Sequence, residues 1–227
     1  MDTNQRSDFS SHRPKLIGES LNFMDITIIS GSHRSSSQSE KVGRYIESLF
    51  KDEYLSVEPF LYLLADNPLP LWDQSVWEAD EKWAQKLTPL KEQFSKSDAF
   101  VIITPEWHGQ VPSGLKNLFL LFSRFEFGHK PALIVAISAS TGGAYPVAEL
   151  RMSSYKNNRL CYIPENLIIR NVEEVFNQNS ADNNEKSDKY YKNRLSWCLD
   201  ILLGYGKALK TVREDIEVHN KAFSNGM

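Results

Sequence analysis

The sequence predicts an α/β protein with a doubly wound, five-stranded parallel sheet and helices on both faces. Short apolar runs alternate with stretches in which apolar side chains recur at helical spacing, which is typical of strands alternating with helices. The runs at 99–104 and 132–138 are almost continuously apolar, as expected of parallel strands covered on both sides. Each unusual loop of the chain directly follows such a run.

The first elements follow from this alternation. The polar residues 1–23 lack periodicity, and we expect a flexible N-terminal extension there. A strand is expected at 26–29. A second strand near 55–64 leads into the loop 67–73, which two prolines stiffen. Between the two strands a helix is indicated by the spacing of Val42, Ile46, Leu49 and Phe50.

The central elements repeat this order around the strand 99–104. The helix before it has one apolar face, formed by Trp83, Leu87, Leu90 and Phe94. Thr88 and Pro89 interrupt that face, and we expect them to be the N-cap and first residue of a new helical segment. After Pro112 a further helix is marked by Leu115, Leu118, Phe119 and Phe122.

The fourth strand is expected at 132–138. The helix that follows it carries the apolar residues Val147, Leu150 and Met152. We expect the fifth strand at 161–163, with 167–169 extending the same edge of the sheet. A polar span separates this strand from the last helix, which should cover approximately 190–212.

Length and composition indicate an ordinary globular protein. A chain of 227 residues fits one domain, which we place at 24–215, followed by a C-terminal tail at 216–227. The net charge of −3 and the scattered basic residues give no reason to expect a nucleic-acid partner. No apolar run approaches the roughly 20 residues that cross a bilayer, and no signal peptide is recognisable. We therefore expect a cytoplasmic protein without a membrane segment.

The cysteines and histidines do not indicate a metal centre. Cys161 and Cys198 lie in apolar contexts without metal-ligand spacing, which predicts buried free thiols. The five histidines show no ligand spacing either. A hydrolase with Ser32 and His33 as nucleophile and base is disfavoured, because adjacent residues rarely align for catalysis and no Gly-x-Ser-x-Gly elbow occurs.

The loop 30–39 is rich in serine and lies between a strand and a helix. Free N–H groups and the positive end of a helix dipole favour an anion at such a place. Donors suited to a terminal phosphate are supplied by the five serine hydroxyls between Ser32 and Ser39 and by the guanidinium of Arg34. The alternative is that these serines only cap the helix and fill an exposed loop.

Two further loops, 104–110 and 138–144, also follow strands. Because crossovers between parallel strands are right-handed, the loops after successive strands gather at the carboxyl edge of the sheet. Ligands bind at that edge where the strand order reverses. The three loops are therefore candidates for one shared site.

Four motifs follow the first four strands. They are Gly31-Ser32-x-Arg34-x-x-Ser37-x-Ser39, then Pro68-Leu69-Pro70-Leu71-Trp72-Asp73, then Pro105-Glu106-Trp107-His108 with Pro112-x-Gly114-Leu115-Lys116-Asn117, and last Ser138-x-Ser140-x-Gly142-Gly143. In this order they resemble the motifs of the NAD(P)H-dependent FMN reductase family of flavodoxin-like proteins. The resemblance covers roughly 25–172.

The resemblance implies a flavodoxin-like fold and FMN as cofactor, with NAD(P)H as a transient electron donor. The phosphate of FMN would be held by Ser32, Arg34, Ser37 and Ser39. The isoalloxazine ring would lie along Pro105, Glu106, Trp107 and His108, and close to Ser140, Gly142 and Gly143. No second phosphate-binding fingerprint occurs, which predicts that the nicotinamide cofactor is held only weakly.

The function implied is an NAD(P)H-dependent oxidoreductase that reduces a small acceptor, namely a quinone, an azo compound or free flavin, by ping-pong hydride transfer. The chain departs from the family in having Ser39 in place of Asn, Trp107-His108 in place of Tyr-Asn, and a shorter glycine run at 140–143. These departures leave the acceptor open. A flavodoxin-like electron carrier or redox-sensing module is the alternative, although such carriers are usually strongly acidic. A degenerate member without FMN is disfavoured by the intact arginine and glycine pair.

Several side-chain roles stay open at this point. Glu106 can be a buried hydrogen-bonding residue, Trp107 core packing or a pocket wall, and His108 a loop residue or an acceptor contact. Lys116 and Asn117 are assigned to structure or subunit contact. The run 118–122 with Phe125 and Phe127 is apolar around more of the helix than one buried face needs, which predicts a homodimer or homotetramer.

Overall fold

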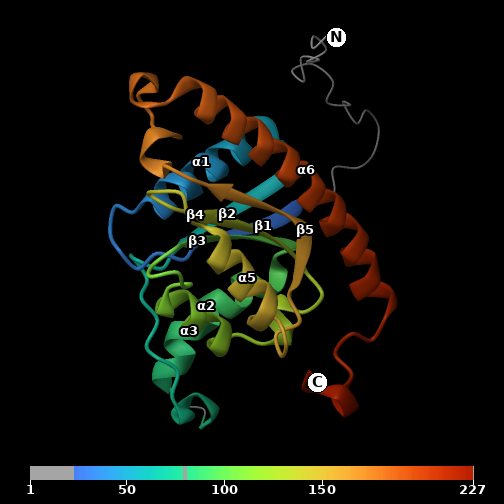
Figure 1. Ribbon diagram of the computed structural model, residues 1–227. Helices are drawn as coiled ribbons and strands as arrows, with labels where there is room; N and C mark the ends of the chain where they lie inside the picture. The colour runs from blue at the N-terminus through green and yellow to red at the C-terminus, as the bar shows by residue number, and fades with distance from the viewer. Residues whose placement is uncertain (1–22, 79–80, 227) are drawn as a thin grey trace.

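Five parallel strands form one sheet in the order β2-β1-β3-β4-β5 (Figure 1). The strands are β1 Met24–Ser30, β2 Val57–Leu63, β3 Ala99–Pro105, β4 Pro131–Ile137 and β5 Cys161–Ile169. This computed structural model describes residues 23–78 and 81–226, so the expected N-terminal extension lies, apart from Phe23, outside the described residues. The order and the all-parallel pairing confirm the predicted doubly wound, flavodoxin-like α/β fold.

Helices cover both faces of the sheet, as predicted (Figure 1). One face carries α1 Gln38–Glu53 and α6 Glu185–Asp215. The other carries α2 Glu81–Lys96, α3 Ser113–Leu121 and α5 Ala144–Ser153, together with the short α4 Arg124–Phe127. All residues of β3 and β4 are buried, because their side chains alternate between two separate apolar cores.

Helix α2 continues through Pro89, so the expected break at Thr88 and Pro89 is wrong. Proline removes one backbone hydrogen bond, but here its ring is exposed. Apolar side chains on both sides of it, Leu87 and Phe94, are buried in the same core. Packing of this continuous face therefore outweighs the local loss.

The two C-terminal elements are longer than the sequence predicts. Helix α6 begins at Glu185, because the Asn184 side chain caps it by accepting a hydrogen bond from Ser187 N at 3.0 Å. The two segments expected for the last strand form one strand, β5, with a register shift between the pairings of Ala132 and Ile134. The irregular stretch contains Pro164. At the opposite edge of the sheet, β2 contains Pro59.

The strand order reverses between β1 and β3. The chain passes from β1 to β2 on one side and returns to pair β3 on the other side of β1. The loops after β1 and β3 therefore leave the sheet side by side at its carboxyl edge, where ligands of doubly wound sheets bind. In the part of the chain that the structure describes, no helix is long and apolar enough to span a membrane.

A buried lysine lies at the opposite, amino edge of the sheet. The Nζ atom of Lys130 donates to the carbonyl oxygens of Phe94 and Ser95, each at 2.7 Å, in the last turn of α2. Positive charge is favourable at a helix C-terminus. Burial nevertheless lowers the pKa of Lys130, the neighbouring Arg213 adds to this shift and Asp98 and Glu126 oppose it, so that the resulting pKa is about 7.

We expect Lys130 to make the free energy of unfolding depend on pH. Its pKa is about 7 when folded and 10.5 in the reference state, so between these values the unfolded chain binds a proton that the folded chain does not. The free energy of unfolding of the wild type should therefore rise with pH across this interval relative to Lys130→Met. Urea unfolding near pH 7 and near pH 9 measures the difference.

The matched control is Lys86→Met, since Lys86 is an exposed lysine of α2, the helix whose last turn Lys130 contacts. The free energy of unfolding of the Lys86→Met protein should depend on pH in the same way as that of the wild type. A Lys130→Met protein with the wild-type pH dependence would contradict the assignment.

Candidate functional site

Gly31 brings the loop after β1 against β3 and α3. Its N–H donates to the carbonyl oxygen of Ile103 at 2.8 Å. A Cβ atom at position 31 would lie 2.6 Å from Leu115 Cδ2 and 2.7 Å from that carbonyl oxygen. Both distances are shorter than any side chain tolerates, so only glycine allows the loop to pass here.

Hydroxyl groups then surround the N-terminus of α1. Ser37 is the N-cap and accepts from Glu40 N at 3.1 Å, while Ser32 Oγ accepts from Arg34 N at 3.2 Å. Ser39 Oγ is buried and has no hydrogen-bond partner among the described residues. The Arg34 side chain is exposed beside them. An unpaired buried hydroxyl and a free guanidinium at a helix N-terminus form a site suited to an anion.

The loop after β3 contains a tight turn at 107–110. Trp107 N donates to Gln110 O at 3.1 Å, and Gln110 N donates to Trp107 O at 2.9 Å. The two central residues, His108 and Gly109, have φ of 50° and 72°. Left-handed backbone at both positions is the feature of a type I′ turn, in which a histidine is strained. The turn thus holds the His108 side chain in an exposed position.

Side-chain contacts join this central loop to the other two. The rings of His33 and Trp107 stack edge to face, with centroids 4.6 Å apart. The Glu106 carboxylate accepts a hydrogen bond from the N–H of Gly143, the N-cap of α5. The predicted convergence of the three loops is thus visible in direct contacts between neighbouring loops.

The loop after β4 is fixed by residues that follow β5. Arg170 Nε donates to the carbonyl oxygens of Thr141 and Gly142, at 2.6 and 3.1 Å. Asn171 N donates to the carbonyl oxygen of Ser140. Ser140 itself is an exposed residue. A Cβ at Gly142 would lie 2.9 Å from either carboxylate oxygen of Glu106. The glycine therefore leaves room for the Glu106 carboxylate.

Four residues at the site were not assigned a role there from the sequence, namely His33, Asn117, Glu149 and Arg170. The Asn117 side chain accepts from Trp72 N at 2.7 Å and donates to Pro70 O at 2.8 Å, so it holds the proline-rich loop against α3. Glu149 on α5 accepts from Val111 N at 2.7 Å. No sequence signal marks Glu149, because a single polar residue on a helix is ordinary, whereas Asn117 belongs to the motif after the third strand and has the structural role expected of it. Among the described residues no cluster of His, Cys, Asp or Glu could hold a metal ion.

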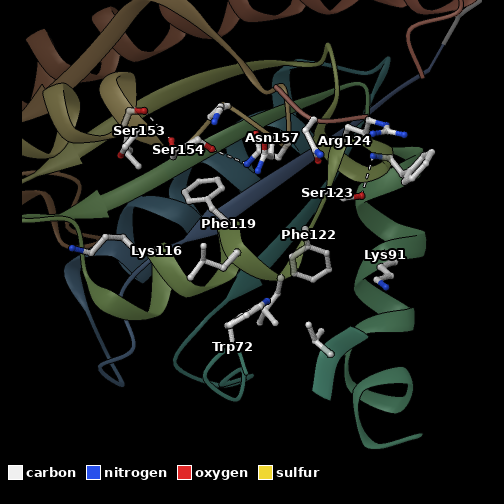
Figure 2. A pocket seen from close by; sticks show the side chains of 18 of the residues that line it. Trp72, Lys91, Lys116, Phe119, Phe122, Ser123, Arg124, Ser153, Ser154 and Asn157 are labelled. Carbon is white, nitrogen blue, oxygen red and sulfur yellow. Dashed lines mark hydrogen bonds between the residues drawn. The ribbon is translucent and has the colours of Figure 1, made fainter. Parts of the chain in front are cut away.

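A groove of about 840 Å³ lies beside the site rather than within it (Figure 2). Its walls come from the loop after β2, from α3 to α5 and from the C-terminal segment near Ser224. The groove includes none of the residues expected to bind FMN. It reaches the site through Val111, Lys116 and Glu149 at one end.

A family model described as NADPH-dependent FMN reductase matches residues 24–174, which include all three loops. The chain belongs to this family. The family's description names both FMN and NADPH, in agreement with the resemblance seen in the motifs.

Curated relatives include azoreductases. An NADPH azoreductase of Bacillus sp. (strain OY1-2) is 31% identical over 120 residues, which cover 53% of this chain and 62% of that protein. An FMN-dependent NADPH-azoreductase of Staphylococcus saprophyticus is 27% identical over 126 residues, covering 55% and 66%. The chain thus spans less than two thirds of the length of these relatives.

Solved structures support the fold. The flavoenzyme NAD(P)H:(acceptor) oxidoreductase FerB of Paracoccus denitrificans superposes with a TM-score of 0.59 at 20% identity, over 83% of this chain and 98% of that one. An NADH:FMN oxidoreductase, EMOB, superposes with a TM-score of 0.57 at 13% identity, over 82% and 89%. At these identities the likeness concerns the fold alone.

The residues present fit FMN. The unpaired hydroxyl of Ser39 is a donor for a phosphate oxygen, and Ser37 accepts from the backbone while its own hydroxyl hydrogen can still be donated. Arg34 adds a positive charge at the same helix end. No Gly-x-Gly-x-x-Gly motif that would cradle a pyrophosphate occurs in the sequence. The site therefore suits a terminal phosphate.

Replacing Arg34 by Ala should weaken FMN binding by about 1.5–3 kcal/mol, the scale of a hydrogen bond to a charged group. Calorimetric titration of FMN into cofactor-free protein measures the change. The matched control is Arg44→Ala, which removes an exposed arginine of α1 that pairs with Glu40 instead. An Arg34→Ala protein that binds FMN as tightly as the Arg44→Ala control would remove Arg34 from the site.

Proposed function

We propose that this protein is an NAD(P)H-dependent FMN oxidoreductase that reduces a small acceptor, namely a quinone, an azo compound or free flavin. The observation that carries the proposal is the buried Ser39 hydroxyl at the N-terminus of α1, which has no partner among the described residues. The loop before α1 contacts the turn at 107–110 through His33 and Trp107. Family membership and the likeness to azoreductases support the same reaction class.

Each loop has a separate task in this proposal. Ser32, Ser37, Ser39 and Arg34 bind the phosphate and so orient the cofactor. Glu106 holds the second and third loops together through Gly143 N–H. When bound, FMN supplies the hydride chemistry. Trp107 and His108 stand at the mouth of the site and shape the space in which the acceptor binds.

Donor and acceptor bind in turn in this proposal. The chain offers one phosphate loop and no second nucleotide fingerprint, so the nicotinamide and the acceptor share one space beside Trp107 and His108. Such sharing requires that the oxidised nicotinamide leaves before the acceptor enters. Kinetics of the ping-pong type follow. The two free thiols, Cys161 and Cys198, are compatible with a cytoplasmic location, which we include in the proposal.

The proposal is tested by stopped-flow reduction of the FMN-loaded protein with NADPH or NADH in the absence of an acceptor. We expect at least one of them to bleach the visible flavin absorption, and subsequent addition of a quinone or azo dye to restore it. If neither nicotinamide bleaches the flavin within minutes while a protein reductase does, the electron-carrier function is correct instead.

The exposed His108 should determine which acceptor is used. We expect His108→Asn to change the ratio of kcat/KM between a quinone and an azo dye by several-fold, and to leave the rate of flavin reduction at saturating NADPH nearly unchanged. Asparagine is chosen because it tolerates the left-handed backbone at this position. An equal decrease in kcat/KM for both acceptors, together with slower flavin reduction, would contradict this role.

We also propose a homo-oligomer, most simply a dimer. Of the apolar side chains that motivated this expectation, Leu118, Phe119, Leu121, Phe122 and Phe127 pack inside the protein, so the excess is smaller than the sequence suggests. Outward-facing apolar residues nevertheless line the groove, with exposed fractions of 74% for Trp77, 66% for Leu120 and 56% for Phe125. Apolar surface of this kind commonly marks an interface.

Sedimentation should give a mass well above the 26.0 kDa of one chain at micromolar concentration. Leu120→Asp should shift the protein towards the monomer, because a charge would be buried in the interface. The control is Leu55→Asp, at an exposed leucine that does not line the groove. A wild type that sediments as a monomer would contradict the proposal.

A further inference from the structure

We propose that Glu149 is a positioning residue that fixes the turn at 107–110 and thereby determines acceptor binding. The inference deepens the proposed function and rests on it. Glu149 lies on α5, outside the motifs that mark the site in the sequence, and we assign it no contact with cofactor or acceptor.

The Glu149 carboxylate makes two contacts with its two oxygens. Oε2 accepts from the backbone N–H of Val111 at 2.7 Å, and Oε1 accepts from Lys116 Nζ at 3.0 Å. Lys116 Nζ lies 3.5 Å from Gln110 Oε1, at the last position of the turn. The carboxylate is therefore directly bonded to the residue that follows the turn, and Lys116 extends this contact towards the turn itself.

The central loop is attached to α5 at both of its ends. Glu106, at its start, binds the N–H of Gly143 at the N-cap of α5. Val111, at its end, is bonded to Glu149 in the second turn of the same helix. The residues between these two anchors include Trp107 and His108. Helix α5 thus serves as a common support for the loop that shapes the mouth of the site.

The turn needs such support because of its own backbone. His108 has a φ of 50°, a conformation that residues with a Cβ adopt only where the surroundings enforce it. His108 and Gln110 are exposed, so few packing contacts enforce it from outside. Without Glu149 the Val111 N–H loses its acceptor in a residue that is 1% exposed. The end of the turn would then shift to recover a partner.

Three variants separate the two contacts. Glu149→Ala removes both. Glu149→Gln keeps an amide oxygen that can accept from Val111 N–H, but it loses the charge that pairs with Lys116. Lys116→Met removes the ion pair and leaves the Val111 contact intact. If the backbone contact fixes the turn, Glu149→Gln and Lys116→Met should resemble the wild type, and Glu149→Ala should not.

The kinetic test uses the FMN-loaded full chain. We expect Glu149→Ala to raise KM for a quinone or azo acceptor about tenfold, because small displacements of positioning groups have effects of this size or larger. The rate of flavin reduction at saturating NADPH should stay within about twofold of the wild type, and the Kd of FMN should change less than the acceptor KM, since the phosphate loop is untouched. Glu149→Gln should have an acceptor KM close to that of the wild type.

A second readout does not depend on activity. Hydrogen exchange followed by mass spectrometry on the full chain, without added FMN, should show faster exchange in the peptide containing 106–111 for Glu149→Ala, and wild-type protection for Glu149→Gln. Unchanged exchange and unchanged acceptor KM in Glu149→Ala would overturn the inference. So would a parallel loss of FMN binding, thermal stability and activity that Gln does not rescue, since that is a general structural role. If wild-type flavin is reduced by neither nicotinamide, the proposed function fails, and the exchange result alone decides whether Glu149 fixes the turn.

Discussion

The close approach of Gly31 to β3 and α3 sets the geometry on which the rest of the site depends. The N–H of Gly31 continues the ladder to Ile103, and the missing side chain lets the loop pass over Leu115. A Cβ at this position would clash with Leu115 and with the Ile103 carbonyl oxygen, so the loop would have to move. The hydroxyl-rich end of α1 would then lose its place beside Trp107, and a ligand spanning both loops could no longer contact them together. The reversal of strand order between β1 and β3 places the two loops next to each other, and Gly31 allows them to approach closely.

Both edges of the sheet carry buried polar groups and left-handed residues. The amino edge has the buried Lys130 on the carbonyls of α2 and Asp98 paired with Arg213, together with the left-handed residues His129 and Arg159 shortly before β4 and β5. The carboxyl edge has the left-handed His108 and the unpaired hydroxyl of Ser39. Incomplete or strained groups are expected where a ligand completes them. At the carboxyl edge such groups coincide with the reversal of strand order, where ligands of doubly wound sheets bind.

Much of the fold could be predicted from the sequence, because fully buried parallel strands such as β3 and β4 appear as apolar runs and because the loop motifs occur in a fixed order. The continuity of α2 through Pro89 could not, since local propensity there is overruled by packing of a face shared by Leu87 and Phe94. The Glu149 contact was equally inaccessible. It depends on how α5 is placed against a loop 38 residues earlier in the chain, which no local pattern encodes.

The two edge strands of the sheet both contain a proline, Pro59 in β2 and Pro164 in β5. An edge strand normally presents a row of free backbone donors that can template the addition of a strand from another molecule. Proline lacks that donor, and the register shift in β5 disturbs the row further. Neither edge can therefore recruit a foreign strand along its full length. Copies of this chain are protected against association through continuous intermolecular sheets, which leaves the helical faces as the surface through which they can assemble.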